Sequence, residues 1–150
     1  MRSGEPPRRD PVFDSLNTAV VIVDRNLLIE TLNPAAEHLL SISETRAQKQ
    51  SLLQVMGDDT ELKDILTRVL ASGATYANEM RLPPTEIHEE ERLVDCRVSM
   101  LLRADEADGL LIEMSDVTRR NRISRENALL NQHGAGRQMI RQLAHEIKNP

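Results

Sequence analysis

Residues 141–150, RQLAHEIKNP, carry the side chains of this sequence with the clearest chemical potential. His145 stands beside Glu146, and Asn149 follows one helical turn after His145, so the imidazole and the carboxamide share a helix face. A neutral imidazole is a good nucleophile near pH 7, and a neighbouring carboxylate can orient the ring and accept its proton. The spacing therefore predicts a reactive histidine with an acid–base partner.

Two further interpretations of His145 stay open on these residues alone. Many histidines on helix surfaces are simply solvated and take part in no reaction. A metal-dependent hydrolase of the His-Glu-x-x-His type would need a second imidazole one turn later, where the sequence has Asn149. Chemistry without a protein-bound metal is therefore favoured at His145.

The face of this helix that lies away from His145 is apolar. At about 100° of rotation per residue, four side chains form one stripe: Ile140, Leu143, Ala144 and Ile147. Our hypothesis is that two copies of the chain pair along this stripe, because the pairing buries it and leaves both His145 rings exposed.

The residues that must supply the fold begin with a hairpin pattern. Residues 20–23 are a β-branched run, residues 24–26 have turn chemistry, and residues 27–31 resume a strand-like pattern. Asn33 and Pro34 then suit the cap and the first position of a short helix. The sequence therefore predicts two antiparallel strands followed directly by a helix.

Helical periodicity continues in short segments after this point. Helices are predicted over residues 52–56 and 62–70, with a cap among residues 58–60 and an end at Gly73. These helices thus separate the first pair of strands from the strands that follow.

Strand patterns return over residues 75–82, 92–103 and 109–115. The acidic residues 86–91 predict a solvated loop, and residues 105–109 predict a turn. Adjacent strands without long crossovers indicate an antiparallel sheet with the short helices gathered on one side, which is an α+β fold.

The composition changes after Val117. Residues 118–133 are polar and free of glycine and proline, which predicts an exposed helix that leaves the domain. Ile123 and Leu130 are one heptad apart, as in a coiled-coil seam. Glycines in residues 134–136 favour a break before helical character resumes at residue 138.

Composition excludes several classes of function. The net charge of −5 and the scarcity of aromatic residues, with only Phe13 and Tyr76, argue against direct nucleic-acid binding. A single cysteine, Cys96, excludes an intrachain disulfide framework and a cysteine-rich zinc site. No run approaches the roughly 18 apolar residues of a membrane span, and no signal peptide is recognisable, so a cytoplasmic location is expected.

Three motifs together resemble one protein family. Residues 143–150, LAHEIKNP, resemble the phosphoacceptor box of sensor histidine kinases. Residues 33–37 resemble the entry to the first helix of PAS domains, and Asp116-Val-Thr118 resembles the motif that closes their last strand. In this order, and without a membrane segment, residues 12–150 resemble the nitrogen-regulation sensor histidine kinases.

The resemblance implies a role for each residue of the terminal motif. His145 would accept the phosphoryl group, Glu146 would be the base, and Asn149 would position water for the opposing phosphatase reaction. The complete kinase would use ATP with Mg and act as a homodimer. Its partners would be an NtrC-like response regulator and a P-II signalling protein whose site lies outside this chain. Since no Gly-rich phosphate loop is present, the chain by itself is expected to be inactive.

The sequence thus divides into four parts. They are a flexible tail (1–11), a PAS sensory domain (12–117), a signalling helix linker (118–137) and the truncated start of the dimerisation and phosphoacceptor helix (138–150). No tightly bound cofactor is expected, because Cys96 falls in a predicted strand and His38 is expected to be exposed. The alternative to a kinase fragment is a stand-alone PAS module for dimerisation or binding, without catalysis.

Overall fold

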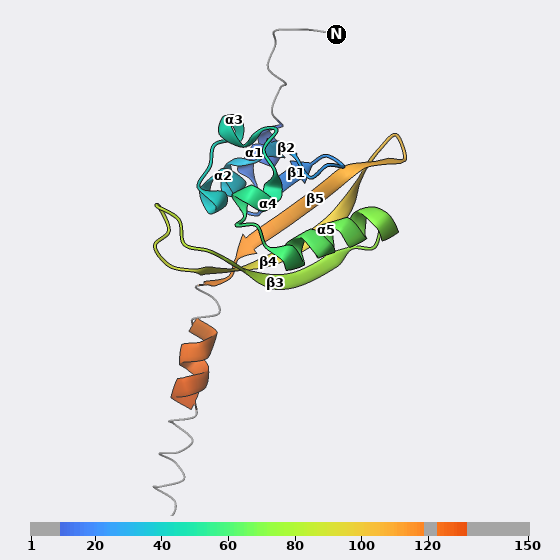
Figure 1. Ribbon diagram of the computed structural model, residues 1–150. Coiled ribbons are helices and arrows are strands. Elements are labelled where there is room, and N and C mark those ends of the chain that lie inside the picture. Colours follow the sequence, from blue (N-terminus) through green and yellow to red (C-terminus); the bar gives the residue numbers. More distant parts are fainter. Residues whose placement is uncertain (1–9, 119–122, 132–150) are drawn as a thin grey trace, which may run out of the picture. The chain divides into compact units, whose positions relative to one another are not determined.

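A single antiparallel sheet organises the N-terminal part of the chain (Figure 1). The computed structural model describes residues 10–118 and 123–131. The chain divides into two compact units, Met1–Asp116 and Val117–Pro150. The first unit contains the five-stranded sheet in the order β2-β1-β5-β4-β3. Its strands are β1 (Ala19–Val23), β2 (Ile29–Leu32), β3 (Tyr76–Leu82), β4 (Arg92–Arg103) and β5 (Glu106–Asp116).

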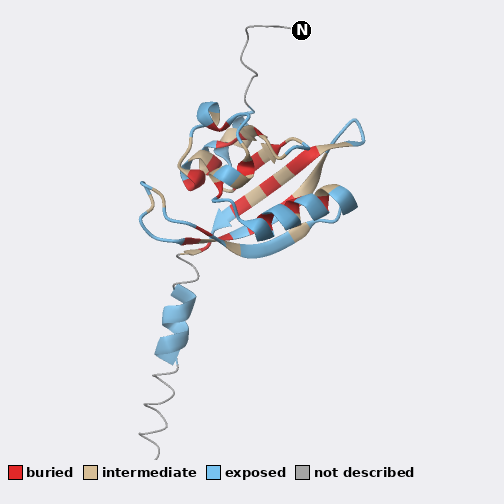
Figure 2. Ribbon diagram, in the orientation of Figure 1, coloured by how far each residue is buried: buried red, intermediate tan, exposed pale blue. Residues whose placement is uncertain are grey.

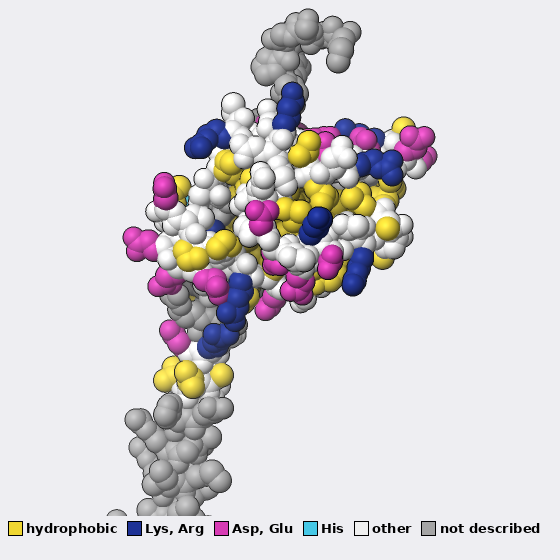
Figure 3. Space-filling view, in the orientation of Figure 1, with side chains coloured by type: hydrophobic (Ala, Val, Ile, Leu, Met, Phe, Trp, Pro, Cys, Tyr) yellow, Lys and Arg dark blue, Asp and Glu magenta, His cyan; other side chains and the backbone are white. Residues whose placement is uncertain are grey.

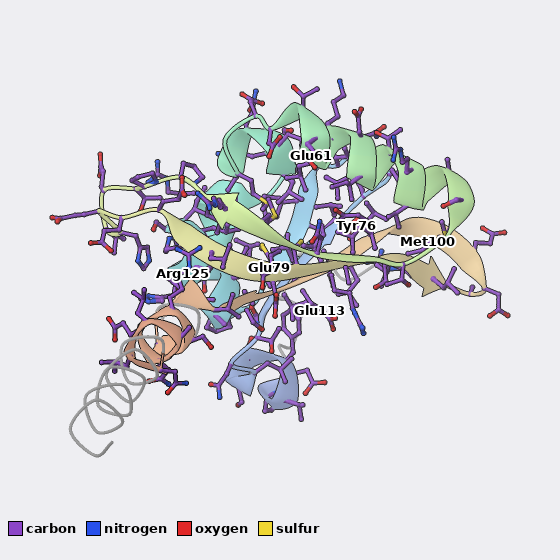
Figure 4. The ribbon with its side chains drawn as sticks, turned by 90° about the horizontal axis from the view of Figure 1, so that it is seen from below. Glu61, Tyr76, Glu79, Met100, Glu113 and Arg125 are labelled. Atoms are coloured by element: carbon purple, nitrogen blue, oxygen red, sulfur yellow. The ribbon has the colours of Figure 1, made fainter. Side chains whose placement is uncertain are left out.

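Short helices fill the chain between β2 and β3, as the sequence predicts. In Figure 4 the longest helix, α5, lies on one side of the sheet and the N-terminal helix, α1, lies on the other. The antiparallel sheet with its short helices confirms the predicted α+β fold. The helices are α1 (Pro11–Ser15), α2 (Pro34–Leu40), α3 (Glu44–Ala47), α4 (Leu52–Val55) and α5 (Thr60–Ser72).

Strand register separates a buried face from an open one. Cys96 pairs with Met114 and Val98 pairs with Ile112, and all four side chains belong to the hydrophobic core. Burial alternates along the strands for this reason (Figure 2). Side chains one position away, such as Arg97, point to the opposite face, which we call the outer face.

Local capping chemistry fixes where the helices begin and end. Asn33 caps α2 through its side chain and Pro34 occupies the first helical position, as predicted. The side chain of Asp59 caps α5. Gly73 ends α5 in a left-handed conformation with φ of 73°, again as predicted.

Three features of the first unit differ from the sequence expectation. The turn predicted over residues 105–109 is wrong, because the reversal occurs at Ala104 and Asp105, both with positive φ, and β5 already begins at Glu106. Helix α1 and helix α3 were not anticipated. Asp10, which caps α1 ahead of Pro11, was hidden within a proline-rich and charged segment.

The described part of the second unit is helical and exposed. Residues 123–131 are helical, and every described side chain in this range is exposed. Ile123, Leu129 and Leu130 are 46%, 56% and 66% exposed, respectively. In Figure 3 hydrophobic side chains gather at the C-terminal end of this helix. The predicted exposed helix is therefore confirmed for these residues.

Candidate functional site

The predicted reactive residues lie outside the described part of the chain. His145, Glu146 and Asn149 fall within residues 132–150, as does the apolar stripe on the same predicted helix. The chemistry assigned to them stays a prediction. The structure describes four features of the first unit that bear on function: a cavity, the buried Arg92, the loop between β3 and β4, and a groove on the outer face.

A cavity of about 310 Å³ lies between the N-terminal half of α5 and strands β3 and β4. Figure 4 labels Glu61 on α5 and Tyr76 on β3, two of the elements that border the cavity. The apolar part of its wall is formed by Leu62, Ile65, Met80, Cys96 and Val98. Its volume is at the lower limit of typical small-molecule sites, so it can admit only a small ligand.

Several polar groups of the cavity lining already have partners. Asn78 Nδ2 donates to Tyr76 Oη at 3.0 Å, and the backbone N–H of Glu61 donates to Asp59 Oδ1 at 2.9 Å. Arg81, the one basic side chain in the lining, forms an ion pair with Glu91 at 3.1 Å. Asp59, Glu61 and Glu79 also belong to the lining, so its acidic residues outnumber its one basic residue.

Cys96 behaves as a core residue. Its side chain is 4% exposed, and burial raises the pKa of its thiol to about 11, so the reactive thiolate is scarce at neutral pH. The interpretation of Cys96 as a small core residue is therefore confirmed. Among the described residues, no group of three or more His, Cys, Asp or Glu side chains is placed to hold a metal ion.

Arg92 is a buried cation at the start of β4. It is only 5% exposed, and its Nη1 donates a hydrogen bond to the backbone carbonyl of Leu39 in the last turn of α2. Burial lowers the pKa of Arg92, while the nearby charge of Asp116 at the end of β5 raises it. Arg92 therefore connects α2 to the end of the strand that closes the first unit. No local sequence pattern predicts this contact, because Arg92 and Leu39 are 53 positions apart.

The acidic loop between β3 and β4 contacts α2 and its C-cap, Ser41. His88 Nε2 lies 3.1 Å from the carbonyl oxygen of His38 and must donate to it, since a carbonyl only accepts. The two imidazole rings pack edge to face at 5.3 Å, and Thr85 Oγ1 lies 3.1 Å from Ser41 Oγ. His38 is exposed and His88 lies in the loop, as expected, but their contact was not anticipated.

A groove of about 790 Å³ runs across the outer face of the sheet. Leu16, just after α1, lies at its margin, and four charged side chains line it: Glu79, Asp95, Arg97 and Glu113. They come from three adjacent strands, β3, β4 and β5. The groove is therefore a mainly acidic surface with an apolar edge.

Comparisons with known proteins identify a family and several relatives. A family model described as PAS fold matches residues 13–122. The sensory histidine kinase/phosphatase NtrB of Salmonella typhimurium is 31% identical over 154 residues, which cover 100% of this chain and 41% of that protein. NtrB of Vibrio alginolyticus is 34% identical over 148 residues, which cover 93% of this chain and 39% of the relative.

Solved structures agree with this family match. The PAS domain of nitrogen regulation protein NR(II) from Vibrio parahaemolyticus has a TM-score of 0.56 and 29% sequence identity, and the match covers 70% of this chain and 94% of that one. A PAS domain from Colwellia psychrerythraea has a TM-score of 0.62 at 19% identity, over 72% of this chain and 92% of that one. The second likeness concerns the fold alone. The chain spans about two fifths of the length of the NtrB relatives above.

Proposed function

The chain belongs to the PAS fold family, and we propose that it is the sensory part of a cytoplasmic nitrogen-regulation histidine kinase of the NtrB type. The observation that carries this proposal is the likeness to NtrB along the whole chain, joined to the likeness of its PAS domain to that of NR(II). No helix in the described ranges is both long and apolar enough to cross a bilayer.

In the complete kinase, His145 accepts the γ-phosphoryl group of ATP and passes it to an NtrC-like response regulator. Glu146 takes the proton of the attacking imidazole, and Asn149 orients water when the kinase acts as a phosphatase. ATP, Mg and the P-II signalling protein bind to parts of the kinase beyond the 150 residues of this chain. The roles of these three residues rest on the resemblance of residues 143–150 to a phosphoacceptor box.

The contribution of the described residues is to detect and transmit a signal. Arg92 donates a hydrogen bond to the last turn of α2, and its positive charge interacts with the negative charge of Asp116. A shift of α2 that moves Arg92 therefore alters the electrostatic surroundings of Asp116. Val117 follows directly in sequence and begins the second unit. The exposed Ile123 and Leu130 then support pairing of two chains along one helical seam.

The proposal is tested with a chimeric kinase. Residues 1–150 of this chain are joined in frame to the part of Salmonella typhimurium NtrB that follows its matched region, and autophosphorylation is measured with γ-labelled ATP and Mg. We expect acid-labile labelling that is abolished by His145→Gln, because the phosphorus–nitrogen bond forms on that imidazole.

A matched control uses a second histidine of the same region. His133→Gln should leave the labelling intact, because residue 133 lies outside the predicted phosphoacceptor motif. Labelling that survives His145→Gln, or that disappears with His133→Gln instead, would refute the assignment of the phosphoacceptor. Leu143→Asp should weaken self-association of the chimera, and unchanged sedimentation would exclude pairing along the terminal stripe.

A stand-alone PAS module is the second candidate. It is favoured by the fact that the family match lies within residues 13–122 and that these include the whole sheet. Sequencing the gene beyond codon 150 separates the two functions. A continuing frame with the asparagine and glycine-rich boxes of the ATP-binding domain supports the kinase, and a stop codon supports a binding module without catalysis.

A further inference from the structure

Strand β3 has an open edge. It stands last in the sheet order β2-β1-β5-β4-β3 and forms one margin of the sheet in Figure 1, so among the described strands only β4 pairs with it. Ala77, Asn78 and Glu79, in the middle of β3, are all exposed. An uncovered edge strand presents backbone N–H and C=O groups that can pair with a further strand.

One hydrogen bond shows which backbone groups of β3 face this edge. The backbone N–H of Glu79 donates to the side-chain oxygen of Asn78 at 2.9 Å, so this N–H points to the open edge. Because the residues of a strand bond to alternate sides, Ala77 and Arg81 present their backbone groups to the same edge. The oxygen of Asn78 therefore occupies the position that a carbonyl of an added strand would take.

The cavity beneath α5 lies beside this edge, on the inner face of the sheet. Leu62 and Ile65 of α5 and Met80 of β3 belong to its apolar wall. In a strand added beside β3, the residue opposite Met80 directs its side chain to this inner face, and its neighbour opposite Glu79 directs its side chain to the outer face. An apolar side chain of the added strand can then enter the cavity.

The charges around the cavity favour a basic partner. Asp59, Glu61 and Glu79 line the cavity, whereas its one basic lining residue, Arg81, is paired with Glu91. A basic side chain that stands opposite Glu79 on an added strand offsets the charge of this carboxylate. The pattern that fits the edge is therefore an alternation of apolar and basic residues.

A second copy of β3 fits this site less well than such a segment. The inner-face side chains of β3 are already used in their own chain, since Leu82 is 1% exposed and Met80 packs against the hydrophobic core. A second β3 therefore has no free apolar side chain to place in the cavity.

We propose that the edge of β3 and the adjoining cavity bind an extended segment of a partner protein in which apolar and basic residues alternate. The segment adds a strand beside β3, and one of its carbonyls replaces Asn78 as the acceptor for the Glu79 N–H. An apolar side chain fills the cavity and a basic side chain pairs with Glu79. Backbone hydrogen bonds supply affinity, and the alternating side chains supply specificity. This inference does not depend on the kinase assignment.

A nuclear magnetic resonance titration of the full chain tests strand addition. The probe is a blocked heptapeptide of alternating valine and lysine. We expect saturable shifts of the amide signals of Ala77, Glu79 and Arg81, and slower exchange of the Glu79 N–H with deuterium because the peptide backbone then binds it. The absence of saturable shifts up to about millimolar peptide, or shifts without protection of Glu79, would overturn the proposal.

Two altered peptides separate strand addition from general attraction between charges. N-methylation of the lysine residues removes the N–H groups that face β3 but keeps every side chain, and it should abolish binding. Replacement of each lysine by glutamate reverses the charge and should weaken binding. Unchanged affinity of the N-methylated peptide would exclude strand addition, and unchanged affinity of the glutamate peptide would exclude the basic pattern.

Variants of β3 test the same contact from the side of the protein. Ala77→Pro removes an N–H at the open edge, where proline is tolerated, and should weaken binding by about tenfold, whereas Ala77→Ser should bind as the parent does. Glu79→Lys should weaken binding by about fivefold, and Glu106→Lys, outside the cavity lining, should not. Equal affinities within either pair would contradict the proposal. If urea denaturation shows that Ala77→Pro does not fold, the pair of lysine variants decides.

Sedimentation of the chain without peptide decides between a partner segment and a second copy. Equal sedimentation of Ala77→Pro and Ala77→Ser supports an edge that is free for a partner. Self-association that Ala77→Pro abolishes and Ala77→Ser retains would show that two β3 edges pair with each other, and it would refute the proposed occupant.

Discussion

The side-chain oxygen of Asn33 accepts a hydrogen bond from the backbone N–H of Val20 at 2.8 Å, across thirteen positions of sequence. The same oxygen caps α2 by accepting from Ala36 N at 2.9 Å, and Asn33 Nδ2 donates to the carbonyl of Thr18 at 2.8 Å. Asn33 is fully buried. One carboxamide therefore joins β1 to α2.

Asn33→Ala should lower the free energy of unfolding by about 2–3 kcal/mol, because it removes a helix cap and leaves buried backbone groups without partners. Urea denaturation of the full chain, followed by circular dichroism, measures the loss. Asn33→Ser is the matched variant, since serine can still cap α2 but is too short to serve both elements. We expect it to recover only part of the stability, and equal losses for both variants would exclude the capping contribution.

Gly109→Ala should prevent stable folding or cost at least about 3 kcal/mol. Gly109 has φ of 147°, and a Cβ at this position would overlap the backbone carbonyl of Val23 on the neighbouring strand. Gly73→Ala is the control, because Gly73 also has positive φ but a Cβ there meets only the flexible end of Met100. We expect the control to cost about 1 kcal/mol, and equal effects would contradict a steric origin at Gly109.

Arg92→Ala should destabilise the chain by about 2 kcal/mol, because the Leu39 carbonyl loses a charged donor in a buried setting. Arg81→Ala removes only an exposed ion pair with Glu91, whose side chains are 67% and 52% exposed, and should change stability by less than about 1 kcal/mol. Denaturant midpoints for the two variants measure the contrast. If Arg81→Ala destabilised the chain as much as Arg92→Ala, the contact of Arg92 with α2 would not explain the loss of stability.

Alkaline pH should destabilise the wild-type chain more than a Cys96→Ala variant. Burial raises the pKa of the Cys96 thiol to about 11 from an ordinary value of 9.0, so the native state retains a proton that the unfolded state releases. The corresponding stability is present below pH 9 and is lost as the pH rises through 11. As the pH rises through this range, the free energy of unfolding of the wild type should fall by about 2–3 kcal/mol relative to that of Cys96→Ala. A pH-independent difference in urea denaturation would contradict this linkage.

Local signals explain which parts of the fold the sequence predicts. Asn33-Pro34 and Gly73 are caps whose chemistry acts within a few residues, and both mark helix ends as expected. Asp10-Pro11 carries the same kind of signal for α1, but its proline-rich surroundings favoured a flexible tail. In β4 the neighbouring Leu93 and Val94 are both apolar, so alternation alone did not show that Val94 fills the core.

Contacts between distant residues could not be predicted in the same way. Arg92 is separated from Leu39 by 53 positions and His88 from His38 by 50, and no local pattern pairs them. The acidic groove likewise depends on the register of three strands, which fixes Glu79 opposite Asp95. The predicted phosphoacceptor residues are the opposite case. A local motif in the sequence predicts their role, but they lie outside the described residues.

Tyr76 gives this chain a built-in optical reporter. The protein contains one tyrosine and no tryptophan, so its intrinsic emission comes from a single phenol in the wall of the cavity beneath α5. That phenol accepts a hydrogen bond from Asn78, which makes its emission sensitive to any molecule that enters and disturbs the pair. Small compounds can therefore be screened against the unmodified protein by fluorescence, with Tyr76→Phe as the dark control.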